Sequence, residues 1–316
     1  MSVYTTLSLA QVQAFAAPYG LEVSDLIPIQ GGIQNTNYFL QSPDQTQHVL
    51  TVFEDMTAAQ AAEIVPVLDH LAAQGLAVAV PLKYDGQAIH MIVDKPAQIA
   101  PRLYGSHPEQ PDGRQVAAIA KAQATLHVAL KDFALQREFN RNHDYWKQVA
   151  TDFMAEMDAA DRALLQQLLA VFALKKQQHP DRPQGLIHAD LFRDNTLFQD
   201  QVLTGILDFY ELHQDEFLYD IAISMNDFCT DYPEYSLNTA KREQFLAAYQ
   251  SVRGLTSDEL ACLDTYLAVV ACRFWLMRLD VAKKNQMQGR VGDDILLKNP
   301  LEMRGLLQER LKSVQQ

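Results

Sequence analysis

The chain has 316 residues, 48% of them hydrophobic and 21% charged, a balance typical of soluble globular proteins and sufficient for two lobes. A net charge of −13 disfavours partners such as a nucleic-acid backbone or an anionic membrane surface. Three cysteines without C-x-x-C spacing argue against disulfides or a zinc site, and the lack of a signal peptide or a bilayer-length apolar run predicts a cytoplasmic protein.

The first third of the chain alternates between helical and extended patterns. Ser8 opens a capping box, which marks the start of a helix. Residues 95–101 carry two prolines and lose periodicity, so we place a hinge near 95–102. The hinge separates a predicted N-terminal lobe at 1–97 from a predicted C-terminal lobe at 98–316, and the motifs described below make the first the nucleotide-binding lobe and the second the catalytic and substrate-binding lobe. The elements predicted before it are helices at 8–19 and at 57–74, the second kinked at Pro66, and strands at 37–41, 48–53, 78–82 and 88–93.

A pair of glycines, Gly31 and Gly32, precedes the strands at 37–41 and 48–53. Glycine permits a tight turn and a close approach of the backbone to a ligand. A plain hairpin turn is the commoner explanation of such a pair, but in kinases a glycine-rich hairpin covers the nucleotide phosphates. The phosphate-binding interpretation is the better one here, because kinase-like acidic motifs follow further along the chain.

Helical patterns dominate the rest of the chain. A small mixed lobe followed by a large helical lobe predicts the fold class α+β with two lobes. Together with the acidic motifs described next, this pattern predicts a two-lobed protein-kinase-like fold. Its small N-terminal lobe is expected to contain an antiparallel sheet, and its larger C-terminal lobe to be mainly helical. The helices predicted in the larger lobe lie at 114–130, 161–178, 218–227, 240–252, 257–280 and 301–314.

The most informative motif reads His-Ala-Asp-Leu-Phe-Arg-Asp-Asn at residues 188–195, and Leu-Asp-Phe follows at 207–209. Apolar segments flank both motifs, so their acidic residues are predicted to lie at strand ends. Protein kinases use H-R-D-x-x-x-x-N followed by D-F-G, in which the first Asp is the base and the Asn and second Asp hold Mg²⁺. The matching catalytic residues here are Asp190 as the base, with Asn195 and Asp208 as metal ligands.

Each of these residues taken singly has a plainer explanation. An Asp-Asn pair in a loop usually caps the backbone. His188 is predicted to be a structural residue that supports the loop, and Asp220 to organise the loop after Asp208 through backbone groups or His188. All the motif residues together, in kinase order and spacing between apolar strands, favour phosphoryl transfer. Carboxylate and amide oxygens are also the ligands that Mg²⁺ prefers.

Several further segments extend the likeness to kinases of small molecules. They lie at 31–40, 49–54, 205–210, 219–229, 273–279 and 298–302. With these segments, the chain resembles the aminoglycoside phosphotransferase and choline kinase superfamily over nearly its whole length. Within that superfamily it is most similar to the bacterial homoserine kinases.

This resemblance implies ATP-dependent phosphorylation of the L-homoserine hydroxyl to O-phospho-L-homoserine, a step of threonine biosynthesis, with Mg²⁺ as cofactor. Kinases normally carry a lysine on the second hairpin strand. Thr51 stands at that position here, as in homoserine kinases, so the group that neutralises the phosphates is left unassigned. The residues that the resemblance assigns to nucleotide binding are Gly31, Gly32, Asn35, Asn37 and Thr51.

Substrate contacts follow from the charges of homoserine. Its carboxylate is expected to bind an Arg, and its ammonium group to bind carboxylates or carbonyls. Arg273 lies in an apolar helical segment and is a candidate for the carboxylate, although it could instead pair with a nearby acid. Tyr210, Asn226 and Asp227 are predicted to line the same cleft.

Other functions stay open at this stage. An aminoglycoside acceptor would require a site rich in acids, and Asp215 and Glu216 leave this alternative possible. A choline acceptor would require an aromatic cage. A sugar acceptor is a further alternative. A non-catalytic pseudokinase finds support only in Thr51, and the intact acidic motif argues against it. The expected partner is a small molecule, with no nucleic acid and no membrane, and the expected assembly is a monomer or homodimer.

Overall fold

The computed structural model describes residues 4–29, 35–135, 143–287 and 299–314, which divide into two compact units. The first unit comprises the described residues of 1–105 and 204–210. The second comprises those of 106–203, 211–287 and 299–314. The division into lobes at 1–97 and 98–316 that we infer from the sequence stays a prediction.

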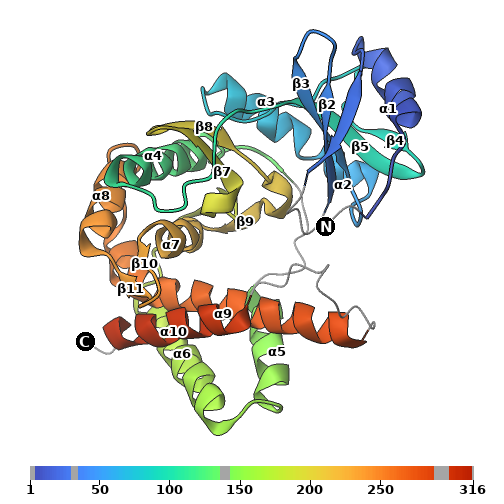
Figure 1. The fold of residues 1–316 in the computed structure, drawn as a ribbon. Coiled ribbons are helices and arrows are strands. Elements are labelled where there is room, and N and C mark those ends of the chain that lie inside the picture. Colours follow the sequence, from blue (N-terminus) through green and yellow to red (C-terminus); the bar gives the residue numbers. More distant parts are fainter. Residues whose placement is uncertain (1–3, 30–34, 136–142, 288–298, 315–316) are drawn as a thin grey trace. The chain divides into compact units, whose positions relative to one another are not determined.

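The first unit contains a five-stranded antiparallel sheet in the order β1-β2-β3-β5-β4 (Figure 1). Alternate residues of β2 are buried, as in a strand with one face on a core. The predicted hairpin of strands at 37–41 and 48–53 is confirmed as β2 and β3. The strands β1 to β5 span Asp25–Pro28, Thr36–Gln41, Gln47–Val52, His90–Ile92 and Lys95–Pro101.

Strand β5 differs from the expectation for residues 95–101, where two prolines suggested a break in regular structure. Pro96 and Pro101 lie near the two ends of the strand, where proline is tolerated because few ladder hydrogen bonds are lost. Between them, Ala97 and Ile99 are fully buried and pair with β3. The segment is therefore part of the sheet.

The helix predicted at 57–74 is two helices. Helix α2 (Ala58–Ala62) ends before α3 (Val65–Ala73), whose first turn contains Pro66. The proline ring fits the first turn of a helix but clashes within a helix interior, which explains the interruption. The remaining helical elements of this unit are α1 (Leu9–Ala16), which begins at the predicted Ser8 capping box, and the 3-10 helix η1 (Ala17–Tyr19).

The second unit is mainly helical, which confirms the predicted α+β fold class. Helix α7 is buried almost throughout, and α9 and α10 lie side by side (Figure 1). Apart from α5, these helices lie close to the predicted positions. The helices α4 to α10 span Gly113–Ala129, His143–Met154, Ala159–Gln178, Phe217–Phe228, Thr239–Gln250, Ser257–Met287 and Pro300–Val314.

Short strands and turns connect these helices around the motif of residues 188–195. Strand β6 (Gln184–Ile187) pairs antiparallel with β9 (His213–Glu216). The other short elements are β7 (Thr196–Gln199), β8 (Val202–Ile206), β10 (Thr230–Asp231), β11 (Ser236–Leu237) and the 3-10 helices η2 (Arg193–Asn195) and η3 (Phe209–Glu211).

One stretch of α9, Ser257–Lys284, is long and apolar enough to cross a membrane by length and composition. However, 72% of its most apolar window is buried within the protein, as in a core helix of a soluble protein. The three cysteines are free and buried. Burial raises the pKa of Cys272, which also lies on α9, to about 12. Core packing is therefore the role that their surroundings support.

Candidate active site

The motif of residues 188–195 folds back on itself between β6 and β7 and ends in η2. The Asn195 side-chain amide donates to the Asp190 carboxylate at 2.9 Å and to the Asp190 carbonyl at 2.8 Å. The Asp190 backbone N–H lies 3.3 Å from Nδ1 of His188, whose side chain is fully buried. Asp190 itself is only half-buried. The predicted base and one predicted metal ligand thus lie together, with the base accessible from solvent.

Ala189 gives this loop its shape. Its φ of 67° lies in the left-handed region, which costs an L residue roughly 1 kcal/mol. Its backbone N–H donates to Oδ1 of Asp220 at 2.7 Å, and the N–H of His188 donates to Oδ2 at 3.4 Å. Hydrogen bonds to a charged acceptor are stronger than neutral ones and offset this backbone cost.

Asp220, on α7, ties the loop to α4. Its carboxylate is fully buried and also lies 2.9 Å from Nε2 of His127 and 3.0 Å from the Gln123 amide nitrogen. Burial alone would raise the pKa of Asp220, but hydrogen bonding to His127 and Ala189 and the nearby histidines hold it below its ordinary value. The carboxylate therefore stays charged and holds the loop backbone in place.

His127 is a residue whose place in this network the sequence did not reveal. In the structure His127 is buried, with Nδ1 2.7 Å from the Tyr249 hydroxyl on α8. The available signal was the pair Gln123 and His127, two polar residues at i and i+4 that share the buried face of α4.

Close packing beneath the loop fixes the position of His127. The Phe217 ring lies 4.6 Å from the His127 ring, centre to centre. A Cβ atom on Gly185, in β6, would lie 2.3 Å from Cζ of Phe217. Glycine at this position therefore allows the close approach of β6 and Phe217.

Two of the predicted substrate residues are engaged within the second unit. Asp227 accepts from the backbone N–H of Arg193, within the motif, at 2.6 Å and from its Nε at 3.1 Å. Asn226 donates to the Leu267 carbonyl at 2.8 Å and accepts from Nε of Arg310 at 2.9 Å. These contacts join α7 to η2, α9 and α10.

The predicted nucleotide-binding residues lie partly within the first unit. Gly31 and Gly32 lie outside the described residues. Asn37 in β2 is opposite Thr51 in β3, and the Asn35 side chain accepts from the backbone N–H of Glu54 at 3.4 Å. The Glu54 side chain in turn accepts from the Thr36 hydroxyl at 2.6 Å and pairs with Lys95.

Tyr210 also lies in the first unit, against the sheet. The Gln98 amide donates to its hydroxyl at 3.3 Å, and its ring meets Phe53 edge-on at 5.2 Å between centres. Burial and the Asp208 charge raise the pKa of Tyr210, despite a hydrogen bond with Thr51. A neutral phenol thus stands beside the position where kinases carry a lysine. Asp208 follows β8 with a φ of 59° and belongs to the same unit.

Arg273 is buried within the second unit, where it donates to the Tyr219 hydroxyl. Its guanidinium carbon lies 5.3 Å from the ring centre of Trp146 and 5.1 Å from that of Tyr219. Burial would lower the pKa of Arg273, but Tyr219 and the acids Glu211 and Asp190 raise it overall. The side chain stays charged within electrostatic range of the predicted base.

The chemistry of the motif fits a magnesium ion. Because the Asn195 nitrogen donates to Asp190, its carbonyl Oδ1 is the atom left for a cation. That amide oxygen and the Asp208 carboxylate are hard ligands of the kind that Mg²⁺ prefers. Within the described ranges, no three His, Cys, Asp or Glu side chains gather as a metal site. An ion with few protein ligands, completed by substrate phosphates, fits this donor set.

Comparison with known proteins gives concordant matches. Residues 25–255 match the model of the phosphotransferase enzyme family. The homoserine kinase of Cupriavidus necator is 36% identical over 291 residues, covering 88% of each chain. The homoserine kinase of Pseudomonas aeruginosa strain LESB58 is 34% identical over 312 residues, covering 98% of this chain and 96% of the relative.

Solved structures of the same fold share much less sequence. An amicoumacin kinase in complex with AMP-PNP, Ca²⁺ and Ami superposes with a TM-score of 0.69 at 15% identity, covering 98% of this chain and 93% of that one. A microcompartment-associated aminopropanol kinase also superposes with a TM-score of 0.69, at 16% identity, covering 97% of this chain and 94% of that one. These likenesses confirm the kinase-like fold predicted from the sequence.

Proposed function

The chain belongs to the phosphotransferase enzyme family, and we propose that it transfers the γ-phosphoryl group of ATP to the side-chain hydroxyl of L-homoserine. The observation that carries this acceptor is the identity of 34–36% to homoserine kinases over 88–98% of the chain. The loop geometry supports the reaction class, because Asp190 and Asn195 lie together as a kinase base and metal ligand do.

Asp190 is proposed as the base. The homoserine hydroxyl oxygen attacks the γ-phosphorus in line, the bond from that phosphorus to the β–γ bridging oxygen breaks, and ADP leaves. The hydroxyl proton passes to the Asp190 carboxylate, so the products are O-phospho-L-homoserine, ADP and a proton. The hydrogen bond from Asn195 fixes the rotamer of that carboxylate. His188 and Asp220 are proposed to hold the loop backbone rather than to touch the reactants.

Asn195 and Asp208 are proposed to hold Mg²⁺. When bound, the ion would neutralise charge on the nucleotide phosphates. Nucleotide binding is proposed for the loop with Gly31, Gly32, Asn35 and Asn37 and for Thr51 on the neighbouring strand. Asn35 and Asn37 flank the start of β2, the strand that continues from this loop.

The acceptor contacts proposed from the sequence differ in their support. Arg273 has the strongest, because it is a buried cation on a cavity wall. Asn226 and Asp227 already use polar atoms for contacts within the protein, and Tyr210 accepts a hydrogen bond in the first unit. We further propose a cytoplasmic enzyme, a monomer or homodimer, with the lobes at 1–97 and 98–316 and no nucleic-acid or membrane partner.

A panel of acceptors tests the proposal. The purified chain is incubated with Mg-ATP and L-homoserine, choline, an aminoglycoside or a hexose, and ADP release is measured. We expect turnover with homoserine that exceeds turnover with the other acceptors by orders of magnitude. Asp190→Asn serves as the control for a contaminating kinase. Turnover of another acceptor without turnover of homoserine would contradict the proposed acceptor, and no turnover with any acceptor would favour a pseudokinase.

A further inference from the structure

We propose that a cavity among α5, α6, α7 and α9 binds the α-carboxylate of the acceptor, with Arg273 and Trp146 as its hydrogen-bond donors. The inference rests on the proposed function and names the part of homoserine that the cavity recognises. The cavity has a volume of about 80 Å³, several times the ~10–15 Å³ that one water molecule needs. Its wall includes Trp146 on α5, Phe172 on α6, Tyr219 on α7 and Arg273 on α9.

Two N–H groups on this wall lack a partner. Nε of Arg273 and Nε1 of Trp146 are both buried, and neither has a hydrogen-bond partner among the described residues. The two groups are adjacent, since the Arg273 guanidinium stacks over the Trp146 ring at 5.3 Å. Buried donors in native proteins are nearly always satisfied. These two therefore point to an acceptor that the described chain does not supply.

The charge of Arg273 also has no ion-pair partner among the described residues. Only 5% of the residue is exposed, and no described carboxylate lies within ion-pair distance of it. Among the described residues its hydrogen-bond partner is the Tyr219 hydroxyl, and burial raises the pKa of that phenol, so it stays neutral. A buried charge is costly unless it is paired. A ligand carboxylate would satisfy both the charge and the free Nε–H.

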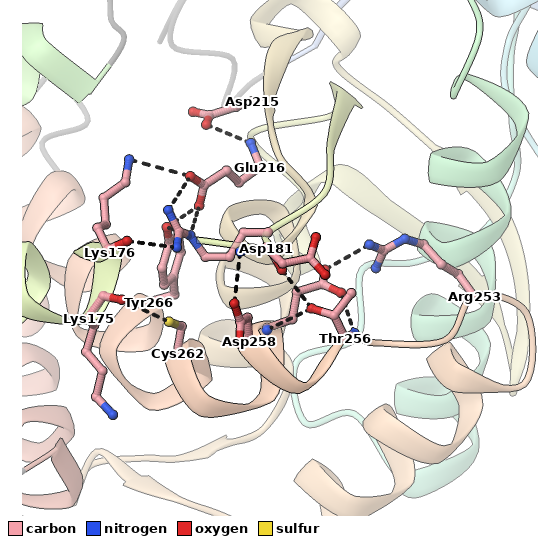
Figure 2. A network of polar contacts seen from close by, with 12 residues as sticks. Lys175, Lys176, Asp181, Asp215, Glu216, Arg253, Thr256, Asp258, Cys262 and Tyr266 are labelled. Atoms are coloured by element: carbon pink, nitrogen blue, oxygen red, sulfur yellow. Dashed lines mark hydrogen bonds and ion pairs between the residues drawn. The ribbon is translucent and has the colours of Figure 1, made fainter. Parts of the chain in front are cut away.

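The two acids on the cavity wall are already engaged, as Figure 2 shows. Glu216 lies 3.0 Å from Nε of Arg182 and 3.5 Å from the Lys176 ammonium, and it accepts from the Tyr266 hydroxyl. Asp215 accepts from the backbone N–H of Glu216 at 2.7 Å and lies 3.6 Å from Nε2 of His213. Both acids thus have partners of their own, and neither neutralises Arg273.

Helix α9, which carries Arg273, also contacts the catalytic loop. Phe274, next to Arg273 on α9, meets Phe192 of the loop edge-on, with ring centres 4.8 Å apart. Burial lowers the pKa of Arg273, whereas Tyr219, Glu211 and then Asp190 raise it, so Arg273 lies within electrostatic range of the proposed base. An amino acid held by its carboxylate at Arg273 can thus direct its side chain toward the base. Acceptors without a carboxylate, such as choline, would leave the buried cation unpaired.

The test compares L-homoserine with L-homoserinamide, in which a neutral carboxamide replaces the carboxylate. In the wild type we expect kcat/KM to be roughly 10- to 100-fold lower for the amide than for homoserine, which is the loss expected when one charge-assisted hydrogen bond is removed. In Arg273→Gln, KM for homoserine should rise by a similar factor, and the preference over the amide should vanish while KM for ATP is unchanged. Arg273→Lys should restore part of the preference for homoserine over the amide. Arg278 lies on the same helix but pairs with Glu302, so Arg278→Gln is the control and should retain the full preference.

A binding measurement gives a second readout without turnover. The chain has two tryptophans, so fluorescence that is lost in Trp146→Phe reports on the cavity. L-homoserine should change this signal saturably, whereas L-homoserinamide should not, and Arg273→Gln should abolish the response. The inference is overturned if Arg273→Gln responds like the wild type or reduces turnover of both acceptors in proportion. A wild type that binds homoserine in the cavity but transfers no phosphate refutes the proposed function alone.

Discussion

Nε2 of His127 lies 2.9 Å from the Asp220 carboxylate, a contact between two fully buried side chains on α4 and α7. The same carboxylate accepts the backbone N–H of Ala189, one residue before the proposed base. A side chain from a distant helix thus determines how firmly the catalytic loop is held. The contact links the stability of the helical unit to the geometry of the loop.

Replacing His127 by alanine should test this link. The substitution leaves the buried Asp220 charge and the Tyr249 hydroxyl each without one partner, so we expect the free energy of unfolding to fall by roughly 3 kcal/mol. Urea denaturation followed by circular dichroism measures the change. Asp69→Asn, which breaks an exposed pair with Lys83, should cost less than about 0.5 kcal/mol. Equal losses in the two variants would contradict the role of the buried network.

The pH dependence of stability should also reflect Asp220. Its pKa is held below the ordinary 3.8 in the folded protein, so the unfolded chain takes up its proton first as pH falls. The stabilisation is therefore present above pH 3.8 and is lost as pH drops through the folded pKa. The Asp220→Asn variant has no carboxylate at this position, so this pH-dependent part of the unfolding free energy should be missing. Unfolding free energies measured between pH 7 and 3 should converge for the two proteins at the acid end, and a constant difference would contradict this account.

Asp190→Asn should separate chemistry from nucleotide binding. Removing a general base typically costs about 10²- to 10⁴-fold in turnover, while the ATP affinity should stay within twofold. Coupled ADP release and titration with a nucleotide analogue measure the two quantities. Asp200→Asn, an exposed acid in the turn after β7, is the matched control and should retain full activity. Normal turnover in Asp190→Asn would exclude it as the base.

Restoring the usual kinase lysine should not help this chain. Thr51 is buried beside Gln98 and Tyr210, so Thr51→Lys would overpack the face of the sheet and bury a charge. We expect a loss of about 1–3 kcal/mol in unfolding free energy and no gain in turnover. Thr51→Val, of similar shape, should cost about 1 kcal/mol for the lost hydroxyl. A more active Thr51→Lys variant would show that the position is open to a cation.

Local patterns in the sequence predicted much of the fold. The capping box at Ser8, the hairpin of β2 and β3 and the apolar spacing of α9 are signals carried within a few residues of each other. The spacing of the motif likewise indicated that Asp190 and Asn195 lie together, while their chemical roles stay predictions. All of these features are set by residues that lie close together in the sequence, so local patterns were enough to predict them.

The errors have equally physical causes. Strand β9 reads His-Gln-Asp-Glu, so no alternation of apolar residues marks it as a strand. Its polar side chains can nevertheless be buried, because ion pairs such as that of Arg182 with Glu216 satisfy them. The prolines in β5 concealed a strand whose interior pairs normally. The contact of His127 with Asp220 joins residues 93 positions apart in the chain, and only the packed structure brings them together.

Gly185 sets a limit on how this protein can be redesigned. Any side chain there would displace the Phe217 ring, which also contacts His127, so a change in β6 would reach the loop backbone through two aromatic rings. Random libraries that include position 185 should therefore yield mostly inactive clones. Libraries meant to broaden the acceptor range are better directed at cavity residues such as Leu168 and Leu169 on α6, which belong to neither of these two rings.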